Sequence, residues 1–573
     1  MASSFRVVKN SYNERPNLPL CALQKGYNMA ATPQRTSYDA IVIGGGHNGL
    51  ITAAYLARAG KRVLVLERRH VLGGCSVSEP IWPGYKVSTA SYVVSLLLPE
   101  VIKDLKLKEN GLEILRRDPS SFTPTSDGRY LLLGPDRQRN QAEISKFSRR
   151  DAEAYPRYES LLEAVAEQIE PILMAAAPDI LPLPRSLRRM GWGKKLRDFR
   201  AAWKMQKSLG RLGAQLPEAI ELLVGAARPI LERWFESDVV RATLATDAII
   251  GAFSSISSPG TAYVLLHHVM GTAGGARGVW GYVRGGMGGL ADAIAQTCRQ
   301  LGVDLLLDAP VARIETAAGA VTGVSLEDGR SFQAKVVAST VDGNLTFNRF
   351  LGAQDLPAEF RAAVNRIDYN SASAKLNVAL REPPRFKCLP SAGVGPQHHG
   401  TMHICDSVEW IERAYADALC GRPSQRPILE VTMPTSVDST VAPPGKHLIS
   451  MFIQYAPYKL AEGNWDQIGD DFAQRCLRLL GEFAPNIPDA VEHYQFLSPV
   501  DLERTYGLTG GNIFQGVMSL NQLHLMRPVA GWADHRTPLR GLYLCGAASH
   551  PGGGVMGACG RNGATEILRD RLI

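Results

Sequence analysis

The sequence lacks the cysteine pairs on which dithiol chemistry and zinc sites depend. Its nine cysteines are scattered along 573 residues, and no two of them form a C-x-x-C or C-x₄-C pair. An odd and dispersed set of this kind is typical of reduced thiols in a reducing compartment. It argues against a disulfide framework, a zinc site and a catalytic redox disulfide, so we expect no bound metal.

Long apolar runs and a strong excess of one charge are also missing. No stretch approaches the roughly 18 consecutive apolar residues that a membrane-spanning helix needs. The net charge of +8 is small for this length, and ten Lys or Arg residues against one acid between Arg185 and Arg211 account for the surplus. Such a local excess is not a nucleic-acid signature, so we expect no nucleic-acid partner.

Acidic residues are scarce in residues 1–37. Five Lys or Arg residues stand there against a single acid, Glu14, among several Ser, Thr and Asn, and no secretory apolar core is present. This composition resembles an organelle presequence. A disordered tail, or upstream residues before a start at Met29, are the alternatives.

What the sequence does contain is a complete β-α-β unit between residues 38 and 66. Residues 39–43 (DAIVI) form an apolar, β-branched run, residues 48–58 have apolar side chains at helical spacing, and residues 61–66 (KRVLVL) form a second run. Gly60 stands where a glycine commonly ends a helix. Because the whole chain exceeds one typical hydrophobic core, we expect two or more domains around this unit.

The turn between the first run and the helix carries a dinucleotide-binding pattern, Gly44-x-Gly46-x-x-Gly49. Gly44 allows the tight turn, Gly46 lets the backbone approach a pyrophosphate, and Gly49 lets the helix pack on the strand. Glu67 closes the second run, where a carboxylate accepts hydrogen bonds from a ribose and disfavours the 2′-phosphate of NADP. An ordinary glycine turn is the alternative, but the flanking strands and the acid favour a dinucleotide site.

Two glycine-rich groups follow this unit. Gly73 and Gly74 come after Arg69 at the spacing of a second cofactor-binding turn, with Cys75 where many two-domain flavoproteins have arginine. Residues 285–289 (GGMGG) open a helix-like run without a convincing strand before it. We therefore interpret the second group as a helix start that meets the cofactor, not as another dinucleotide site.

The last part of the sequence has the same order of elements as the first motif, a strand followed by glycines and a helix. Residues 542–544 form a short apolar strand that ends at Gly546, and residues 552–554 (GGG) lead into a predicted helix. The N-terminus of that helix would stabilise negative charge on a cofactor. His550 could donate a proton there, although a structural role beside Pro551 is the alternative.

Two other segments carry notable side chains. The spacing predicts a basic amphipathic helix over residues 185–212, with Leu196, Phe199, Trp203 and Leu209 on one stripe that only the polar Gln206 interrupts. The stripe either docks on an anionic membrane or admits an apolar substrate, or it simply packs on its own domain. The pair His267-His268 cannot share one helix face, which makes a metal site there improbable.

Taken together, these motifs resemble those of the phytoene desaturase and carotenoid isomerase-like FAD flavoproteins, and the resemblance runs from about residue 38 to the end. Four further stretches are similar to one branch of that family, whose members are described as mitochondrial. They are ERRHVLGG (67–74), ATLATDAIIGA (242–252), YVLLHHVMG (263–271) and LTGGNIFQGVMSLNQL (508–523). The resemblance implies FAD as cofactor, with contacts at Gly44, Gly46, Gly49, Glu67, Gly73, Gly74 and Gly546.

The resemblance also implies an α/β fold in which a discontinuous Rossmann-like FAD-binding domain carries an inserted, mixed α+β substrate domain. The expected FAD-binding segments are 38–110, 276–345 and 500–573. The expected substrate-domain segments are 111–275 and 346–499, and residues 1–37 form the extension.

The function expected from this resemblance is that of an FAD-dependent oxidoreductase acting on a small apolar substrate. A flavin-dependent isomerase without net redox turnover and a non-catalytic regulator or interaction protein are the alternatives. The mitochondrial matrix is the expected location, with a peripheral membrane surface or a mitochondrial protein as expected contacts. No residue is assigned a catalytic role from the sequence.

Overall fold

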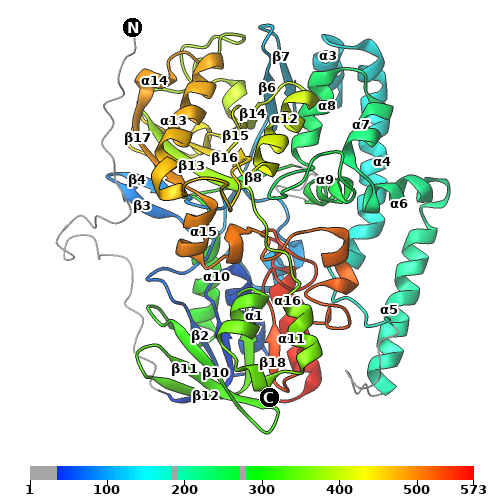
Figure 1. Ribbon diagram of the computed structural model, residues 1–573, viewed down its shortest axis with the longest axis vertical. Helices are drawn as coiled ribbons and strands as arrows, with labels where there is room; N and C mark the ends of the chain where they lie inside the picture. The colour runs from blue at the N-terminus through cyan, green and yellow to red at the C-terminus, as the bar shows by residue number, and fades with distance from the viewer. Residues whose placement is uncertain (1–34, 182–191, 272–278) are drawn as a thin grey trace.

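The computed structural model describes residues 35–181, 192–271 and 279–573 (Figure 1). The predicted N-terminal extension therefore lies outside the described residues, apart from its last three positions, and so does the beginning of the basic segment. In the described part of the chain no helix is long and apolar enough to cross a membrane.

The first sheet is built around the predicted β-α-β unit. Its main path runs β10-β11-β12-β1-β2-β9, and β18 also pairs with β12. The pairs that join β9, β2, β1, β12 and β18 are parallel, whereas β10, β11 and β12 form an antiparallel meander. The strands are β1 (Ser37–Ile43), β2 (Val63–Leu66), β9 (Asp304–Leu306), β10 (Val311–Ala317), β11 (Ala320–Leu326), β12 (Ser331–Ser339) and β18 (Leu542–Leu544).

Register brings the carboxyl ends of the parallel strands to one edge of this sheet. Ile43 pairs with Leu66 on one side and with Ser339 on the other, and Ser339 pairs with Leu544. In open α/β sheets ligands bind outside this edge. Segments from both ends of the chain therefore meet at one place.

Both faces of the central strand β1 are buried, which explains its unbroken apolar run. Ala40 and Val42 pack into the core on the side of the helices, while Ile41 and Ile43 pack into a second core on the opposite face. Alternate side chains of a strand point to opposite faces, so each face receives its own set. The helices α1 (His47–Arg58), α10 (Gly288–Gln300) and α16 (Ala558–Asp570) cover the first face, with α1 against both of the others.

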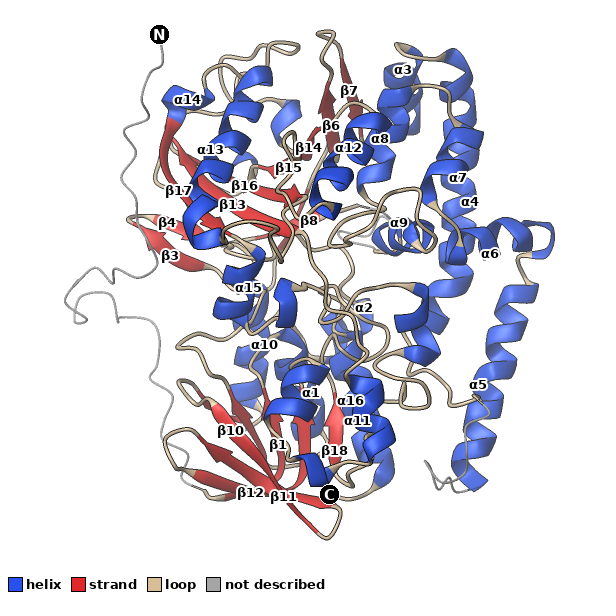
Figure 2. Cartoon of the chain, viewed as in Figure 1, coloured by secondary structure: helices blue, strands red, loops and turns tan. Residues whose placement is uncertain are grey.

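A second sheet stands above the first (Figure 2). Its order is β17-β13-β16-β15-β14-β6-β7, and all neighbours are antiparallel except β14 and β6. Both inserted segments contribute strands to it. They are β6 (Ser121–Pro124), β7 (Tyr130–Leu133), β13 (Ser373–Leu380), β14 (Thr401–Ile404), β15 (Ile428–Thr432), β16 (His447–Gln454) and β17 (Val491–Leu497).

Helices stand along one side of the molecule and around the second sheet (Figure 2). Along the side run α3 (Arg137–Ser145), α4 (Arg149–Leu173), α5 (Trp192–Gly210), α6 (Leu216–Val224), α7 (Ala227–Trp234), α8 (Asp238–Thr246) and α9 (Thr261–Val269). With the second sheet go α12 (Val408–Leu419), α13 (Trp465–Phe483), α14 (Ile487–Ala490) and α15 (Pro499–Tyr506). The remaining elements are α2 (Pro99–Asp104), α11 (Ala358–Val364), and the pairs β3 (Glu79–Trp82) with β4 (Tyr85–Val87) and β5 (Ile114–Arg116) with β8 (Gly281–Val283).

Two details differ from the sequence interpretation. A short strand, β8, does precede the glycines 285–289, but it pairs antiparallel with β5 and not with the parallel sheet. From the sequence, the lack of a convincing strand before these glycines argues against a second dinucleotide turn. The structure has such a strand, but a dinucleotide turn follows a strand of the parallel sheet, and β8 is not one. The packing alternative for the stripe of α5 is wrong for Leu196, Phe199 and Trp203, which are 52%, 68% and 58% exposed, and is confirmed only for Leu209, which packs half-buried against the main core.

Candidate cofactor and substrate site

The turn between β1 and α1 is closed by contacts that only glycine permits. Gly44 has φ +99°, and its N–H donates to the carbonyl of Leu66 at 2.8 Å. A Cβ at Gly49 would lie 2.0 Å from the carbonyl oxygen of Gly44, so a side chain there would push α1 away from the strand. These two glycines therefore serve the protein's own packing.

Gly46 differs, because the protein itself leaves room for a side chain at this position. A Cβ there would meet its nearest neighbours, the Cα of Gly74 and the carbonyl of Gly73, at 3.8 and 3.9 Å, which is ordinary contact. Gly46 and Gly73 form an isolated parallel bridge, and the N–H of Gly73 donates to the carbonyl of Gly45 at 2.9 Å. The second glycine turn is thus fastened to the first, and Gly46 borders the cavity.

Glu67 stands at the end of β2 with a buried carboxylate. Its two oxygens accept the N–H groups of Gly45 at 2.8 Å and Arg69 at 2.9 Å. Burial raises the pKa of this carboxyl, and the two backbone donors and the nearby guanidinium groups oppose that rise. One acid therefore links both glycine turns and still faces the cavity.

Glu67→Ala should weaken FAD binding by about tenfold to a hundredfold, because a hydrogen bond to a charged group contributes about 1.5–3 kcal/mol. The dissociation constant of FAD, measured by fluorescence titration of the apoprotein, checks this. Asp151→Ala is a matched control, because Asp151 is also buried and accepts two backbone N–H groups, those of Glu236 and Ser237 at 2.9 and 2.8 Å, at a place outside the cavity lining. If both variants lose stability but neither loses FAD affinity, Glu67 only braces the turns.

The structure separates the seven predicted contact residues into two groups. Five of them line the cavity, namely Gly44, Gly46, Gly49, Glu67 and Gly74. Gly73 and Gly546 stand behind this lining, where a Cβ at Gly546 would lie 2.2 Å from the carbonyl oxygen of Thr340. Gly546 therefore permits close packing of the segment after β18 on the end of β12.

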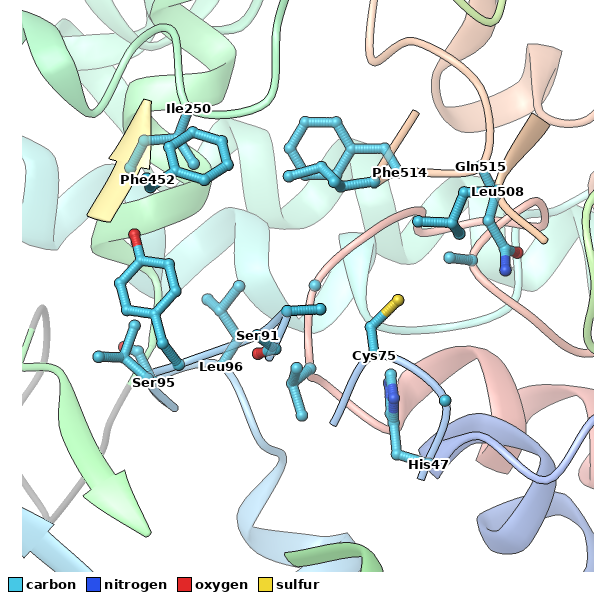
Figure 3. Close-up of a pocket in the computed structure, with 18 of the residues that line it drawn as sticks. His47, Cys75, Ser91, Ser95, Leu96, Ile250, Phe452, Leu508, Phe514 and Gln515 are labelled. Carbon is cyan, nitrogen blue, oxygen red and sulfur yellow. The ribbon is translucent and has the colours of Figure 1, made fainter. Parts of the chain in front are cut away.

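A cavity of about 1150 Å³ extends from these turns to the underside of the second sheet. Figure 3 shows His47 and Cys75 on one side of it and Ile250 and Phe452 on the other, with Leu96 between them. Its volume exceeds the roughly 300–1,000 Å³ of most ligand pockets. The cavity is large enough for a dinucleotide and a second molecule together.

Five ionisable side chains line the same cavity, four of them buried and Asp247 half-buried, and the sequence analysis assigned none of them. They come from β13, β14, β15, the end of α8 and the loop after β5, and they are Lys375, His403, Glu430, Asp247 and Arg117. Charged residues are almost never fully buried unless they are paired or functional. The available signal was a lysine and a glutamate within the apolar runs 373–380 and 428–432.

Lys375 is the most unusual member of this group. Its Nζ lies 3.5 Å from the centre of the Tyr92 ring and has no hydrogen-bond partner among the described residues. Burial holds the pKa of this amine well below its usual 10.5, although the neighbouring Glu430 opposes the shift. A buried amine without a hydrogen-bond partner lowers the stability of the folded protein, so we infer that Lys375 has a functional role in the cavity.

The two carboxyl groups of the cluster hold protons near neutral pH. Burial raises the pKa of Asp247 to about 7, and burial together with the charge of Asp247 raises the pKa of Glu430 to about 8. His403 is neutral, because burial lowers its pKa to about 3. Perturbed pKa values of this kind gather at functional sites.

The histidines and cysteines noted in the sequence occupy different places. His267 and His268 line the cavity, and burial lowers their pKa values to about 3 and about 4, so both are neutral. His550 is buried against the ring of His524, and in the part of the chain that the structure describes it does not line the cavity. Cys75 lines the cavity, and burial raises the pKa of its thiol to about 11. The eight described cysteines are all free thiols.

The glycine segments 285–289 and 552–554 also differ from their interpretation. Of these residues only Gly554 lines the cavity. Gly286 and Gly288 instead pack against Ser78, whose hydroxyl accepts the N–H of Gly288 at 2.9 Å. Helix α16 begins at Ala558, after the triple glycine, and a Cβ at Gly560 would lie 2.4 Å from the carbonyl of Asn48.

Comparison with known proteins matches residues 49–568 to the family described as flavin containing amine oxidoreductase. "Pyridine nucleotide-disulfide oxidoreductase domain-containing protein 2" from Rattus norvegicus is 44% identical over 587 residues, covering 100% of this chain and 99% of that protein. "Phytoene desaturase (lycopene-forming)" from Pantoea ananas is 25% identical, covering 92% and 98%. The resemblance described from the sequence is thereby confirmed.

A solved structure shows the same fold. The crystal structure of an oxidoreductase from Methanosarcina mazei is similar with a TM-score of 0.54 at 16% identity, and covers 92% of this chain and 99% of that one. Together with the two sheets, this likeness confirms the predicted α/β class with a Rossmann-like domain and a mixed second domain.

Proposed function

The chain belongs to the flavin containing amine oxidoreductase family, so its cofactor is FAD, and we propose that it oxidises a small apolar molecule by removing a hydride from carbon. FAD supplies the acceptor for the two electrons and the proton of that hydride. The observation that carries the proposal is that one continuous cavity joins the glycine turns to a space enclosed by Leu96, Ile250, Phe452 and Phe514.

The residues present fit the cofactor. Gly46 keeps the floor of the cavity open where a pyrophosphate approaches, and the N-terminus of α1 offers its free N–H groups to the phosphates. Glu67, fixed by two backbone donors, presents its carboxylate where a ribose hydroxyl donates. These residues would hold and orient the dinucleotide, and the inner part of the cavity would remain for the substrate.

The apolar lining supports the proposed substrate class. Aromatic and aliphatic side chains line the inner cavity together with the ionisable cluster, and burial of apolar substrate surface against the apolar ones contributes about 25 cal/mol per Å² to binding. The relative from Pantoea ananas is named for desaturation of phytoene, a hydrocarbon. A ligand of that chemistry fits this lining without needing an ion pair.

Removal of hydrogen from the substrate also requires a group that takes up a proton, and two carboxyl groups of the ionisable cluster line the cavity. Loss of a hydride leaves a carbocation-like centre, and the neighbouring C–H must then release a proton to form the double bond. Asp247, with a pKa of about 7, is partly ionised at neutral pH and can accept this proton, whereas Glu430, with a pKa of about 8, is mostly protonated there. We assign them as candidate proton carriers within the cavity.

Anaerobic titration tests this proposal. Purified holoprotein should lose its visible flavin absorbance in proportion to added substrate when terpenes, linear polyenes and long-chain alkenes are screened, and a dehydrogenated product should form. Primary amines form the contrasting set of the screen. Bleaching by amines alone would contradict the apolar assignment, and conversion of a polyene without net dehydrogenation would identify an isomerase instead.

A further inference from the structure

Helix α5 exposes its apolar stripe to solvent, unlike an ordinary surface helix. Surface helices of soluble proteins normally bury their apolar stripe and expose their charges. Here Leu196, Phe199 and Trp203 stand 52%, 68% and 58% exposed, whereas Asp198, on the opposite face, is buried. Figures 1 and 2 show the helix standing at the outer edge of the molecule.

Ion pairs fix α5 in this orientation. The Nζ of Lys194 lies 2.7 Å from a carboxylate oxygen of Asp198 and 3.1 Å from one of Asp534. Arg197 reaches Glu566 of α16 at 3.4 Å, and that carboxylate is buried. Turning the helix to hide its apolar side would separate Lys194 and Arg197 from these buried carboxylates, which opposes that movement. The exposed stripe is therefore a constant feature of the fold.

The cations beside the stripe indicate what covers it. Arg200, Lys204 and Lys207 are exposed on its flank, and the Nζ of Lys207 lies 5.4 Å from the ring centre of Trp203. Asp198 is the only acid between residues 193 and 211, and it faces inward. A bulky aromatic and aliphatic stripe bordered by cations matches the boundary between acyl chains and anionic headgroups.

We propose that α5 binds an anionic lipid surface, with Leu196, Phe199 and Trp203 inserted among the acyl chains and Arg200, Lys204 and Lys207 at the headgroups. A second copy of this chain is a poor occupant, because a two-fold interface would set these cations against one another. Helix α4 packs against α5 and lines the cavity with Tyr155 and Tyr158. The proposal does not depend on the proposed reaction.

Vesicle flotation tests the proposal with the full-length holoprotein. Wild-type protein should float with vesicles of phosphatidylcholine and phosphatidylglycerol, and not with phosphatidylcholine alone. Binding should fall at high salt, because salt screens the headgroup charge. The triple variant Leu196→Gln/Phe199→Gln/Trp203→Gln and the triple variant Arg200→Glu/Lys204→Glu/Lys207→Glu should each reduce the bound fraction by at least about tenfold.

Matched variants separate this site from general effects. Lys103→Glu/Lys106→Glu/Lys108→Glu makes the same charge change at exposed positions elsewhere, and Leu419→Gln removes an apolar side chain that is 66% exposed. Both should float like wild type, and all variants should keep their FAD content, which reports folding. Equal flotation with neutral vesicles, no flotation at low salt, or a dimer that the stripe variant converts to monomer without changing flotation would each overturn the proposal.

Discussion

Gly46→Val should produce a folded protein that purifies without FAD. The nearest protein atoms to a Cβ at this position are 3.8 Å away, so the substitution meets no obstacle within the protein. The valine methyls would project into the space where the pyrophosphate must meet the backbone. We expect loss of the visible flavin spectrum with a circular dichroism spectrum like that of wild type.

Two other glycines provide the comparison for Gly46→Val. Gly49→Ala adds one carbon 2.0 Å from the carbonyl of Gly44, so it should lower the stability of the protein itself and reduce soluble yield. Gly393→Val meets nothing within 4 Å and should leave both folding and FAD content unchanged. Retention of FAD by Gly46→Val at the wild-type stoichiometry would place the dinucleotide elsewhere.

Lys375→Met should stabilise the protein and at the same time slow flavin reduction by about two orders of magnitude or more, because a buried amine with a lowered pKa is also a candidate acceptor for the proton that the substrate releases. The Nζ of Lys375 is buried without a hydrogen-bond partner among the described residues, and an unsatisfied buried polar group costs about 1–3 kcal/mol. Methionine has a similar volume and removes that cost. Chemical denaturation measures the gain in free energy of unfolding, and anaerobic stopped-flow absorbance measures the loss of rate.

The pH dependence of that stability gain has a definite sign. Burial places the pKa of Lys375 in the folded protein well below the 10.5 of the unfolded chain, so the unfolded state binds more protons between these two values. Wild-type stability therefore rises with pH in that window, and the advantage of Lys375→Met should shrink as the pH approaches 10.5. Lys335→Met, at an exposed position on β12, should change neither stability nor rate. A variant that is less stable than wild type and reduced at the normal rate would contradict this interpretation of Lys375.

The β-α-β unit could be predicted from the sequence because every signal in it is local. Apolar runs, helical spacing and the glycine pattern lie within 30 residues, and the structure places β1, α1 and β2 within two residues of the expected bounds. Gly546 was predicted as a cofactor contact, yet its role in packing depends on the carbonyl of Thr340 in a neighbouring strand. A contact over that sequence distance leaves no local pattern.

The ionisable cluster and the orientation of α5 could not be predicted from the sequence, because both depend on contacts between residues that are far apart in the chain. Lys375 and Glu430 face each other only because β13 and β15 lie on either side of β16 in one sheet. The apolar stripe of α5 was visible, but which face points outward depends on Asp534 and Glu566, more than 300 residues along the chain. Periodicity identifies two faces of a helix and does not say which one meets solvent.

The meeting of β1, β2, β12 and β18 at one edge sets an order of events during synthesis. The ribosome releases the first glycine turn early, but α16, which packs against α1, and β18, which completes that edge, belong to the last part of the chain. Until residues 542–570 emerge, the turn at residues 44–49 lacks part of its support. We therefore expect stable FAD binding to require residues 542–570, although they lie far along the chain from the turn that they support.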